Sequence, residues 1–350
     1  GVPMTDLLSL PLPELTRWVT QELGEPKYRA GQLYHWLHKK QVPTFEEMSN
    51  LPAPLRQRLA QTAFITPVTT RRRLESALDG TRKFLFALAD GSCVEAVWME
   101  YHHGPSLCIS TQVGCRMGCQ FCASTLGGLV RNLTPGEMLQ EVYEAQRQMG
   151  RPISSLVLMG IGEPLDNLPN VLAFLEILCS EEGQQLGWRH VSLSTCGLIP
   201  GIRELMDKRL GLTLSISLHA PDDAARSAIM PVNRSYPIGE LMAVCREYFA
   251  ATGRRVSYEY ALIDGVNDSP EQAAALARLL KGQTCHVNLI PVNPVAERAT
   301  RRSSRAAVER FARRLGQLGV NATVRRELGS DIAAACGQLR RQSADSPEEA

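Results

Sequence analysis

The chain has 350 residues, of which 44% are hydrophobic and 21% are charged, and its formal net charge at pH 7 is +2. Its apolar runs are far shorter than the roughly 20 residues that a membrane-spanning helix requires, and its first residues lack the basic and apolar regions of a signal peptide. We therefore exclude a membrane protein and expect a cytoplasmic one, with one barrel-sized domain and a smaller appendage.

The cysteine and arginine content indicates what the chain binds. Ten cysteines follow no export signal, so we expect reduced thiols or metal ligands rather than a disulfide framework. Residues 297–341 contain eleven arginines, no lysine and four acidic residues, and Arg71–Arg73 form a second basic cluster. Guanidinium groups bind phosphates, which favours a nucleic acid as partner, although a solvated helix face has the same composition.

Residues 1–65 are predicted to form a small helical accessory domain. Apolar residues recur at the i, i+3 and i+4 spacing of amphipathic helices in three segments, 12–23, 28–40 and 51–63. Residues 66–100 are predicted to form a β-rich extension. Its three β-rich runs are separated by the turn dipeptides Asp79–Gly80 and Asp90–Gly91.

Residues 101–330 alternate between predicted strands and predicted helices. The strands span 106–111, 153–159, 190–195, 212–218, 256–262 and 286–292. The helices between them span 135–149, 168–182, 200–208, 237–253 and 269–282. Six such units predict an α/β fold, an open partial (βα)6 barrel, with its chemistry at the carboxyl ends of the strands. One more helix and strand close the domain. Residues 331–350 are predicted to form a cysteine-containing loop and a disordered polar tail.

Three cysteines follow the first barrel strand in a C-x3-C-x2-C pattern, at Cys115, Cys119 and Cys122. A structural zinc site requires a fourth ligand, and the sequence offers no evident one. Three thiolates on a 4Fe–4S cluster leave one iron open, which the amino and carboxylate groups of S-adenosylmethionine (SAM) can chelate. Phe121, before the last cysteine, also matches the radical-SAM pattern. The motif predicts a radical-SAM cluster, with a zinc knuckle as the alternative.

Polar residues follow several of the predicted barrel strands. In a parallel sheet these strand ends meet at one edge, so we expect their side chains to lie near a bound ligand. A single buried histidine is more often a satisfied core residue, but several polar groups at strand ends favour a site. These residues are Glu163 in the glycine loop that contains Gly160 and Gly162, Ser194, Ser217, His219 and Asn293.

Two cysteines outside the cluster motif carry a resemblance to a known family. Cys108 precedes the motif by seven residues, and Cys336 lies in ACGQL near the end of the chain. Together with GCRMGCQFCAS, GIGEPL, STCG, SLHAPDD and LIPVNP, they make the chain similar to the RlmN/Cfr family of radical-SAM RNA methyltransferases. The resemblance covers about residues 15–341. We assign the remaining cysteines to structural roles: Cys93, Cys179, Cys196, Cys245 and Cys285.

The resemblance implies a role for each matching residue. Cys115, Cys119 and Cys122 would hold the 4Fe–4S cluster. SAM, of which two are used per turnover, would contact Gly162, Glu163, Ser194, Ser217, Leu218, His219 and Asn293. Cys336 would carry a methyl group as S-methylcysteine and form a covalent adduct with an adenine. Glu95 would remove the ring proton, and Cys108 would then release the product and form a transient disulfide with Cys336.

The resemblance also implies the substrates and partners. One branch of the family methylates carbon 2 of an adenosine in 23S rRNA at the peptidyl transferase centre, and some members also methylate the adenosine beside the tRNA anticodon. The other branch methylates carbon 8 of the same rRNA base and confers antibiotic resistance. The resemblance further implies that the accessory domain of residues 1–65 binds RNA. The basic C-terminal segment and this helical N-terminal unit favour the first branch. We expect a monomer that receives electrons from a donor such as flavodoxin or ferredoxin.

The sequence departs from the family pattern near Cys336. Family members commonly have aspartate where this chain has Ser330 and Ala333. This puts the hydrogen bonding of the cysteine loop in question. An alternative from another class is a non-catalytic zinc-containing RNA-binding protein, which would leave Cys108 and Cys336 without a role.

Overall fold

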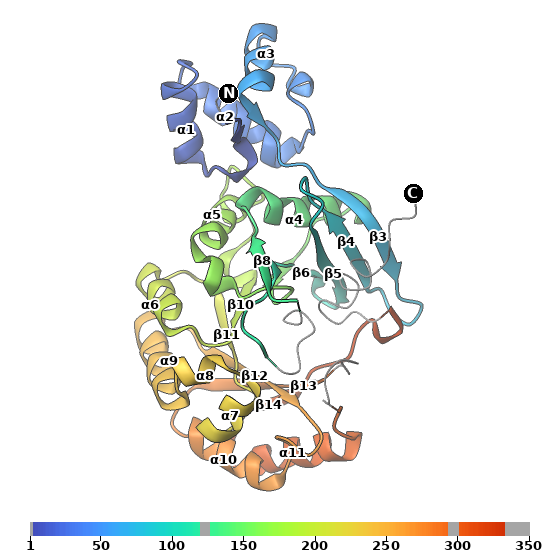
Figure 1. The fold of residues 1–350 in the computed structure, drawn as a ribbon, viewed down its shortest axis with the longest axis vertical. Helices are drawn as coiled ribbons and strands as arrows, with labels where there is room; N and C mark the ends of the chain where they lie inside the picture. Colours follow the sequence, from blue (N-terminus) through green and yellow to red (C-terminus); the bar gives the residue numbers. More distant parts are fainter. Residues whose placement is uncertain (1–2, 120–126, 293–300, 333–350) are drawn as a thin grey trace.

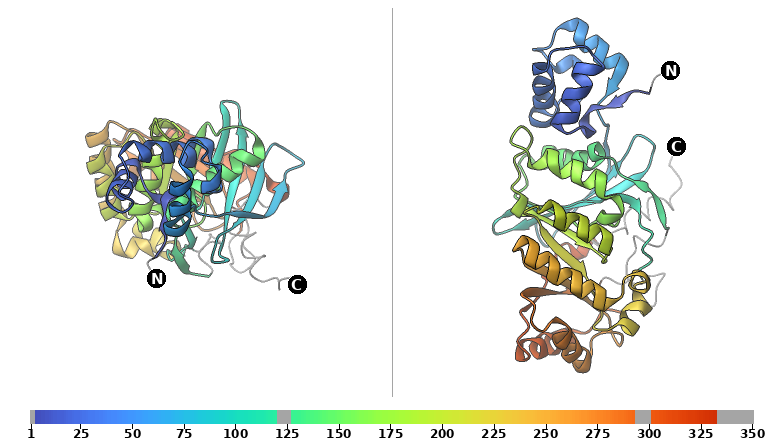
Figure 2. Two further views of the ribbon diagram at one scale, coloured as in Figure 1. Left: turned by 90° about the horizontal axis from the view of Figure 1, so that it is seen from above. Right: turned by 90° about the vertical axis from the view of Figure 1, so that its left-hand side faces the viewer.

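A computed structural model describes residues 3–119, 127–292 and 301–332. The molecule is elongated, with the N-terminal helical unit at one end and the last helices of the barrel at the other (Figure 1). A side view shows the barrel helices stacked along one side of the sheet (Figure 2). Each helix in the described ranges is too short or too polar to cross a membrane.

The N-terminal unit consists of short helices around a buried core of leucines. Its helices are α1 (Leu12–Gln21), α2 (Tyr28–His35) with a π-helical turn (Trp36–Lys40), and α3 (Ala53–Thr62), with 3-10 turns at Leu7–Ser9 and Phe45–Glu47. Leu15, Leu33 and Leu59 are fully buried, as the amphipathic spacing predicts. The strands β1 (Thr5–Asp6) and β2 (Ala63–Phe64) pair in parallel and join the two ends of the unit.

One ten-stranded sheet forms the rest of the fold, in the order β14-β13-β12-β11-β10-β9-β6-β5-β4-β3. Its parallel part comprises β6 (Gly104–Cys108), β9 (Ser155–Leu158), β10 (Val191–Thr195), β11 (Thr213–Ser217), β12 (Val256–Leu262), β13 (Cys285–Pro291) and β14 (Ala322–Val324). The intervening helices are α4 (Pro135–Met149), α5 (Leu168–Cys179), α6 (Ile199–Lys208), α9 (Ile238–Thr252), α10 (Pro270–Leu280) and α11 (Arg305–Gln317). The open α/β barrel that the sequence predicts is therefore confirmed.

The β-rich extension continues the barrel sheet. Strands β3 (Thr69–Glu75), β4 (Arg82–Ala87) and β5 (Cys93–Tyr101) are antiparallel, and β5 pairs with β6, the first barrel strand. Side chains alternate between the two faces of a strand. Fully buried alternate residues of β5 and β6, such as Trp98 and Leu107, belong to the hydrophobic core that also contains Val142 of α4. The residues between them face the opposite, inner side of the sheet.

Four short elements of the barrel domain, two strands and two helices, were not predicted from the sequence. Strands β7 (Gln112–Gly114) and β8 (Leu129–Asn132) form an antiparallel hairpin that carries the cysteine motif. Helices α7 (Asp223–Ile229) and α8 (Val232–Ser235) follow β11. Each element has at most seven residues, so none is long enough to produce a clear hydrophobic period.

Candidate active site

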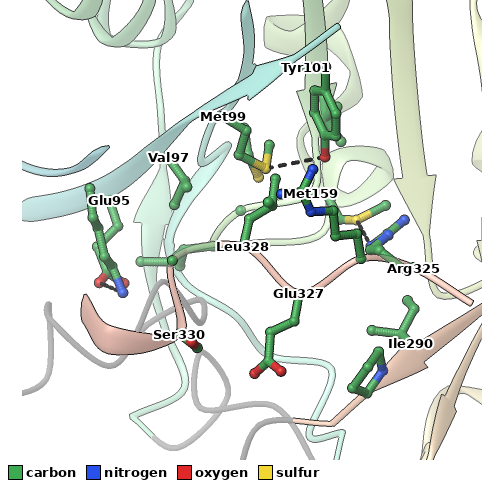
Figure 3. A pocket seen from close by; sticks show the side chains of 18 residues that line it. Glu95, Val97, Met99, Tyr101, Met159, Ile290, Arg325, Glu327, Leu328 and Ser330 are labelled. Atoms are coloured by element: carbon green, nitrogen blue, oxygen red, sulfur yellow. Dashed lines mark hydrogen bonds and ion pairs between the residues drawn. The ribbon is translucent and has the colours of Figure 1, made fainter. Parts of the chain in front are cut away.

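Glu95 and Cys108 line a single cavity of about 290 Å³ on the inner face of the sheet (Figure 3). The strand register explains this. Val97 pairs with Lys83 on one side and with Cys108 on the other, so the three side chains form a row across β4, β5 and β6. Glu95 and Met99 lie two residues from Val97 along β5 and therefore face the same side. The sequence predicted both Glu95 and Cys108 but not that they share a wall.

Most of the remaining cavity wall is apolar. It is formed by side chains from β5, from β9 and the loop after it, from the end of β13 and from the segment after β14: Met99, Tyr101, Val157, Met159, Ile161, Ile290, Pro291 and Leu328. The Tyr101 hydroxyl lies 3.6 Å from the Met99 sulfur, at the opposite end of the β5 row from Glu95 (Figure 3). Arg325 also lines the cavity, and it donates to Glu259 at 2.9 Å.

Lys83 and Glu95 form a buried ion pair. The Lys83 ammonium nitrogen lies 2.8 Å from a Glu95 carboxylate oxygen, and the two side chains are 0% and 3% exposed. Burial penalises a charge unless an opposite charge compensates it. In the sequence, Lys83 is only a basic residue that follows the Arg71–Arg73 cluster, and the pairing of β4 with β5 is what places it inside.

Cys108 lies half-buried at the end of β6. Burial raises the pKa of its thiol to about 12, while the nearby cations Arg325 and Lys83 act in the opposite direction. The thiol is therefore protonated at neutral pH until another group changes its surroundings.

Ser110 connects three segments around the cavity. Its hydroxyl donates to the Glu95 carbonyl at 2.6 Å and accepts from the Ile161 amide at 3.1 Å. Its own amide donates to the Glu141 carboxyl at 3.0 Å. Glu141 is fully buried on α4, and burial raises its pKa well above the ordinary value, which favours the neutral acid. Sequence reasoning missed both residues, because a serine in a strand and a glutamate in a helix carry no distinctive signal.

The β7–β8 hairpin holds the cysteine motif beside the barrel mouth. Cys115 and Cys119 are both buried, and the Cys115 amide donates to the Gly128 carbonyl at 3.1 Å. Cys119 packs in a small apolar cluster with Cys196 and with residues of α7 and α8. Cys122 lies outside the described residues.

Gly162 and Glu163 lie against this hairpin. Gly162 has φ of +106°, and a Cβ at this position would lie 2.7 Å from the Cβ of Gln112, so only glycine is accommodated. The Glu163 carboxyl accepts from the amides of Leu165 at 2.9 Å and Cys196 at 2.7 Å. Burial raises the pKa of Glu163. Each carboxyl oxygen thus already has one backbone donor, and an ammonium group would bind at its remaining lone pairs.

The predicted SAM-contacting residues of β10 and β11 lie together at the strand ends. The Ser194 and Ser217 hydroxyl oxygens are 3.4 Å apart. Leu218 is fully buried. His219 has φ of +60°, and its Nδ1 accepts from the Ala261 amide at 2.8 Å. Burial lowers the pKa of His219 to about 3, so the ring is neutral. Asn293 lies outside the described residues.

The chain after β14 crosses to the turn between β3 and β4. Asp331 accepts from the Ser76 hydroxyl at 2.7 Å and from the Ala77 amide at 2.8 Å. Asp79 accepts in return from the Gly329 amide at 3.0 Å. These bonds hold residues 329–331, which precede the cysteine loop. Ala333 and Cys336 lie outside the described residues.

The donor set of this site is suited to a 4Fe–4S cluster and SAM. Buried thiols are the usual ligands of such clusters. Next to them, Gly162 leaves room for the backbone to approach a ligand closely. Ser194, Ser217 and the neutral His219 provide polar groups without a competing charge.

Comparison with known proteins identifies the family. The family model of the radical SAM superfamily matches residues 109–277, and the model of the ribosomal RNA large subunit methyltransferase N-terminal domain matches residues 5–65. A probable dual-specificity RNA methyltransferase RlmN from Clostridium perfringens is 52% identical over 338 residues, which is 97% of each chain. Its counterpart from Lachnospira eligens is 50% identical over 337 residues, 96% of each chain. This chain belongs to the RlmN family.

Structural comparison agrees with the assignment to RlmN-type radical-SAM enzymes. A radical SAM methyltransferase from Sphaerobacter thermophilus superimposes with a TM-score of 0.90 at 45% identity, over 96% of this chain and 99% of that one. The chain is therefore a SAM-dependent methyltransferase that uses a 4Fe–4S cluster. The zinc-containing, non-catalytic alternative is not supported.

Proposed function

We propose that this enzyme methylates carbon 2 of an adenosine in 23S rRNA at the peptidyl transferase centre, and so acts where its substrate is made, in the cytoplasm. The observation that carries the proposal is the shared cavity of Glu95 and Cys108, the two residues to which the resemblance assigns the base and the resolving thiol. The RlmN names of the relatives favour carbon 2 over carbon 8. Since those names include dual specificity, we extend the proposal to the adenosine beside the tRNA anticodon.

The cavity is suited to a flipped purine base. An enzyme that modifies a base in structured RNA has to remove it from its stack and hold it in a pocket with apolar walls. The cavity is close in size to small-ligand sites, and Val97, Met99 and Met159 give it apolar walls. A base between them would have Glu95 and Cys108 at its edge.

In the proposed mechanism, Cys115, Cys119 and Cys122 hold the cluster, and Glu163 with the β10 and β11 strand ends holds SAM. When bound, the cluster supplies the electron that cleaves SAM to a radical. A direct polar methyl transfer is unavailable, because adenine carbon 2 is neither acidic nor nucleophilic. An electron donor such as flavodoxin or ferredoxin completes the system, and the chain acts as a monomer.

The chain's own residues then perform the acid–base and sulfur chemistry. Cys336 presents its S-methyl carbon, which would give up one hydrogen atom to the SAM-derived radical and then bond to carbon 2 of the ring, and the surplus electron of this adduct would return to the cluster. Glu95 accepts the proton that leaves carbon 2 of the ring, and Lys83 holds the Glu95 carboxylate in place. Cys108 attacks the Cys336 sulfur. The bond between the Cys336 sulfur and the bridging carbon breaks, and a Cys108–Cys336 disulfide forms. The bridging carbon takes up a proton and becomes the methyl group on the adenine.

Basic residues around the barrel support an RNA substrate. Arg310, Arg313 and Arg314 on α11 are exposed. Arg302 is held by Glu327 in a two-pronged ion pair of 2.9 and 2.7 Å, which leaves it less available to phosphate. We therefore expect the α11 arginines to contribute more than Arg302 to the salt dependence of RNA affinity.

A trapping experiment tests the proposal. Cys108→Ala enzyme, loaded anaerobically and given an rRNA fragment with SAM, should accumulate RNA covalently attached through Cys336. Cys336→Ala should retain the cluster and give neither adduct nor product. Mass spectrometry of the nucleosides from the wild-type reaction should show 2-methyladenosine. Normal turnover by Cys108→Ala, or an 8-methyl product, would overturn the assignment.

A further inference from the structure

A fully buried arginine lies beneath the strand ends that form the SAM site. Arg226 on α7 has 0% exposure. Its guanidinium donates to the carbonyls of Leu218 at 3.0 Å, Ser217 at 2.9 Å and Cys196 at 2.5 Å. It also donates to the side chain of Asn233 at 3.1 Å. All these acceptors are neutral.

No carboxylate in the described ranges pairs with Arg226. The nearest acidic residue on its own helix is Asp223, and the Asp223 carboxylate accepts from Asn233 at 3.0 Å and from the Ile238 amide at 2.8 Å. Carbonyl dipoles compensate a buried cation only in part, and an isolated charge is costly in a medium of low dielectric constant. Burial accordingly lowers the pKa of Arg226, while the sulfur groups of Cys196 and Cys119 act in the opposite direction. A nearby anion would thus stabilise the charged form of Arg226.

The contacts of Arg226 place such an anion in the direction of the cluster cysteines. The peptide around Cys196 is held between two ionisable groups, with Glu163 accepting from its amide and Arg226 donating to its carbonyl. The Cys196 side chain in turn packs with Cys119 and with Ile229, three residues beyond Arg226 on α7. The guanidinium therefore binds the backbone of a residue that packs in the same apolar cluster as the predicted cluster ligand Cys119.

We propose that Arg226 is the buried counter-cation of the 4Fe–4S cluster and favours its reduced state. The inference rests on the proposed ligation by Cys115, Cys119 and Cys122. A cluster held by three thiolates is anionic, and reduction adds one more negative charge. A fixed positive charge in a dry environment stabilises the more negative state, which raises the reduction potential. Arg226 acts through electrostatics and does not touch the reacting atoms, so it is a positioning residue.

Two substitutions separate the charge of Arg226 from its hydrogen bonding. Arg226→Gln keeps amide donors for the carbonyls and removes the charge, whereas Arg226→Lys keeps the charge and removes the planar fork. Arg234→Gln is the matched control, because Arg234 is an exposed arginine on the neighbouring helix α8. The measurement is an anaerobic redox titration of the reconstituted cluster followed by electron paramagnetic resonance, which needs no RNA and no turnover.

We expect Arg226→Gln to lower the equilibrium constant for cluster reduction about tenfold, which corresponds to about 59 mV for one electron. Arg226→Lys should retain most of the wild-type potential, and Arg234→Gln all of it. Equal shifts in the two Arg226 variants, an unchanged potential in Arg226→Gln, or failure of both variants to fold would overturn the proposal and leave Arg226 as a structural clamp. If wild-type protein forms no cluster signal at all, the proposed cluster ligation has failed instead.

Discussion

Lys83 and Glu95 are two opposite charges in a place where neither would be stable alone. They lie on adjacent strands, face the same cavity and are 2.8 Å apart. Glu95 can serve as a base only as a carboxylate, and a buried carboxyl without a cation favours the neutral acid. In the proposed mechanism the lysine therefore contributes to both stability and chemistry.

Removal of this lysine should be costly. We expect Lys83→Met to reduce the free energy of unfolding by about 3–5 kcal/mol, because it leaves the Glu95 carboxylate buried without its partner. The double variant Lys83→Met, Glu95→Leu should recover most of that loss in urea-unfolding measurements on the cluster-free protein. Arg82→Met serves as the control, since Arg82 is the adjacent residue on β4 and only partly buried. A double variant no more stable than Lys83→Met would contradict the ion-pair account.

The protonated state of Cys108 has a measurable pH signature. Because its pKa is raised to about 12, the thiolate fraction should grow about tenfold for each pH unit between pH 8 and 10. Alkylation of Cys108 by iodoacetamide, followed by peptide mass spectrometry, should rise in the same proportion. Cys93, which has a similar partial exposure, provides an internal reference for general access to the sheet. A Cys108 alkylation rate that levels off below pH 9 would contradict the prediction.

Among the elements, the turn between β3 and β4 holds the end of the described chain in place. It is the anchor for residues 329–331, which lead towards Cys336, through the bonds of Asp331 to Ser76 and Ala77 and of Gly329 to Asp79. The hydrogen bonds from Thr81 and the Gly329 amide lower the pKa of Asp79 to about 2, against the opposing effect of desolvation, so this acceptor stays charged throughout the physiological range. The β-rich extension thus contributes both a wall of the cavity and an attachment for the cysteine segment.

Loss of this anchor should impair methyl transfer without unfolding the protein. We expect Asp331→Ala to reduce the yield of RNA cross-linked to Cys336, in the Cys108→Ala background, by about tenfold, since the variant loses both hydrogen bonds that hold the segment before Cys336 to the turn. Hydrogen exchange at the Ala77 amide should accelerate in the same variant. Leu78→Ala, at the exposed tip of the same turn, is the control. Unchanged cross-linking in Asp331→Ala would mean that the anchor has no part in positioning Cys336.

Sequence patterns predicted the elements that carry the motifs better than the residues that support them. The βα alternation predicts that the cysteines and the polar groups at strand ends lie close together, because parallel strands bring their carboxyl ends to one edge of the sheet. Lys83 and Arg226 could not be recognised in this way. Lys83 adjoins Arg82 and resembles surface charge until the register with β5 is known. Arg226 lies in a seven-residue helix, too short for a periodic signal, and its partners are backbone carbonyls that any sequence possesses.

At the scale of the whole molecule, the N-terminal unit is attached to the barrel by specific polar contacts. The Tyr34 hydroxyl lies 3.0 Å from that of Ser180, and the His38 Nδ1 lies 2.8 Å from the Tyr143 hydroxyl on α4. The Gln184 side chain donates to the His38 carbonyl at 2.6 Å. His38 is fully buried at this junction, and burial lowers its pKa to about 3.

The junction should weaken in acid. The pKa of His38 is depressed from 6.5 to about 3 on folding, so its neutral form stabilises the protein fully above pH 6.5, and this stability is lost as the pH falls towards 3. At pH 5 the loss should be about 2 kcal/mol. His38→Gln should show a smaller difference between pH 7 and pH 5 in urea unfolding, whereas the exposed His35→Gln should behave as wild type. Equal pH dependence in all three proteins would exclude His38 as the cause.

The single row of Lys83, Val97 and Cys108 across three antiparallel strands has a consequence for how this family can evolve. A strand tolerates many replacements of its side chains. Deletion of Ala96, however, would move Glu95 and the residues before it to the opposite face of the sheet relative to Val97. Glu95 would then enter the hydrophobic core beside Trp98, and the cavity would lose its carboxylate although no side chain with a chemical role had been substituted. Homologous proteins should therefore vary in composition along β5 while keeping its length, and insertions should accumulate in the turns at either end, where Asp90–Gly91 and His102–His103 lie.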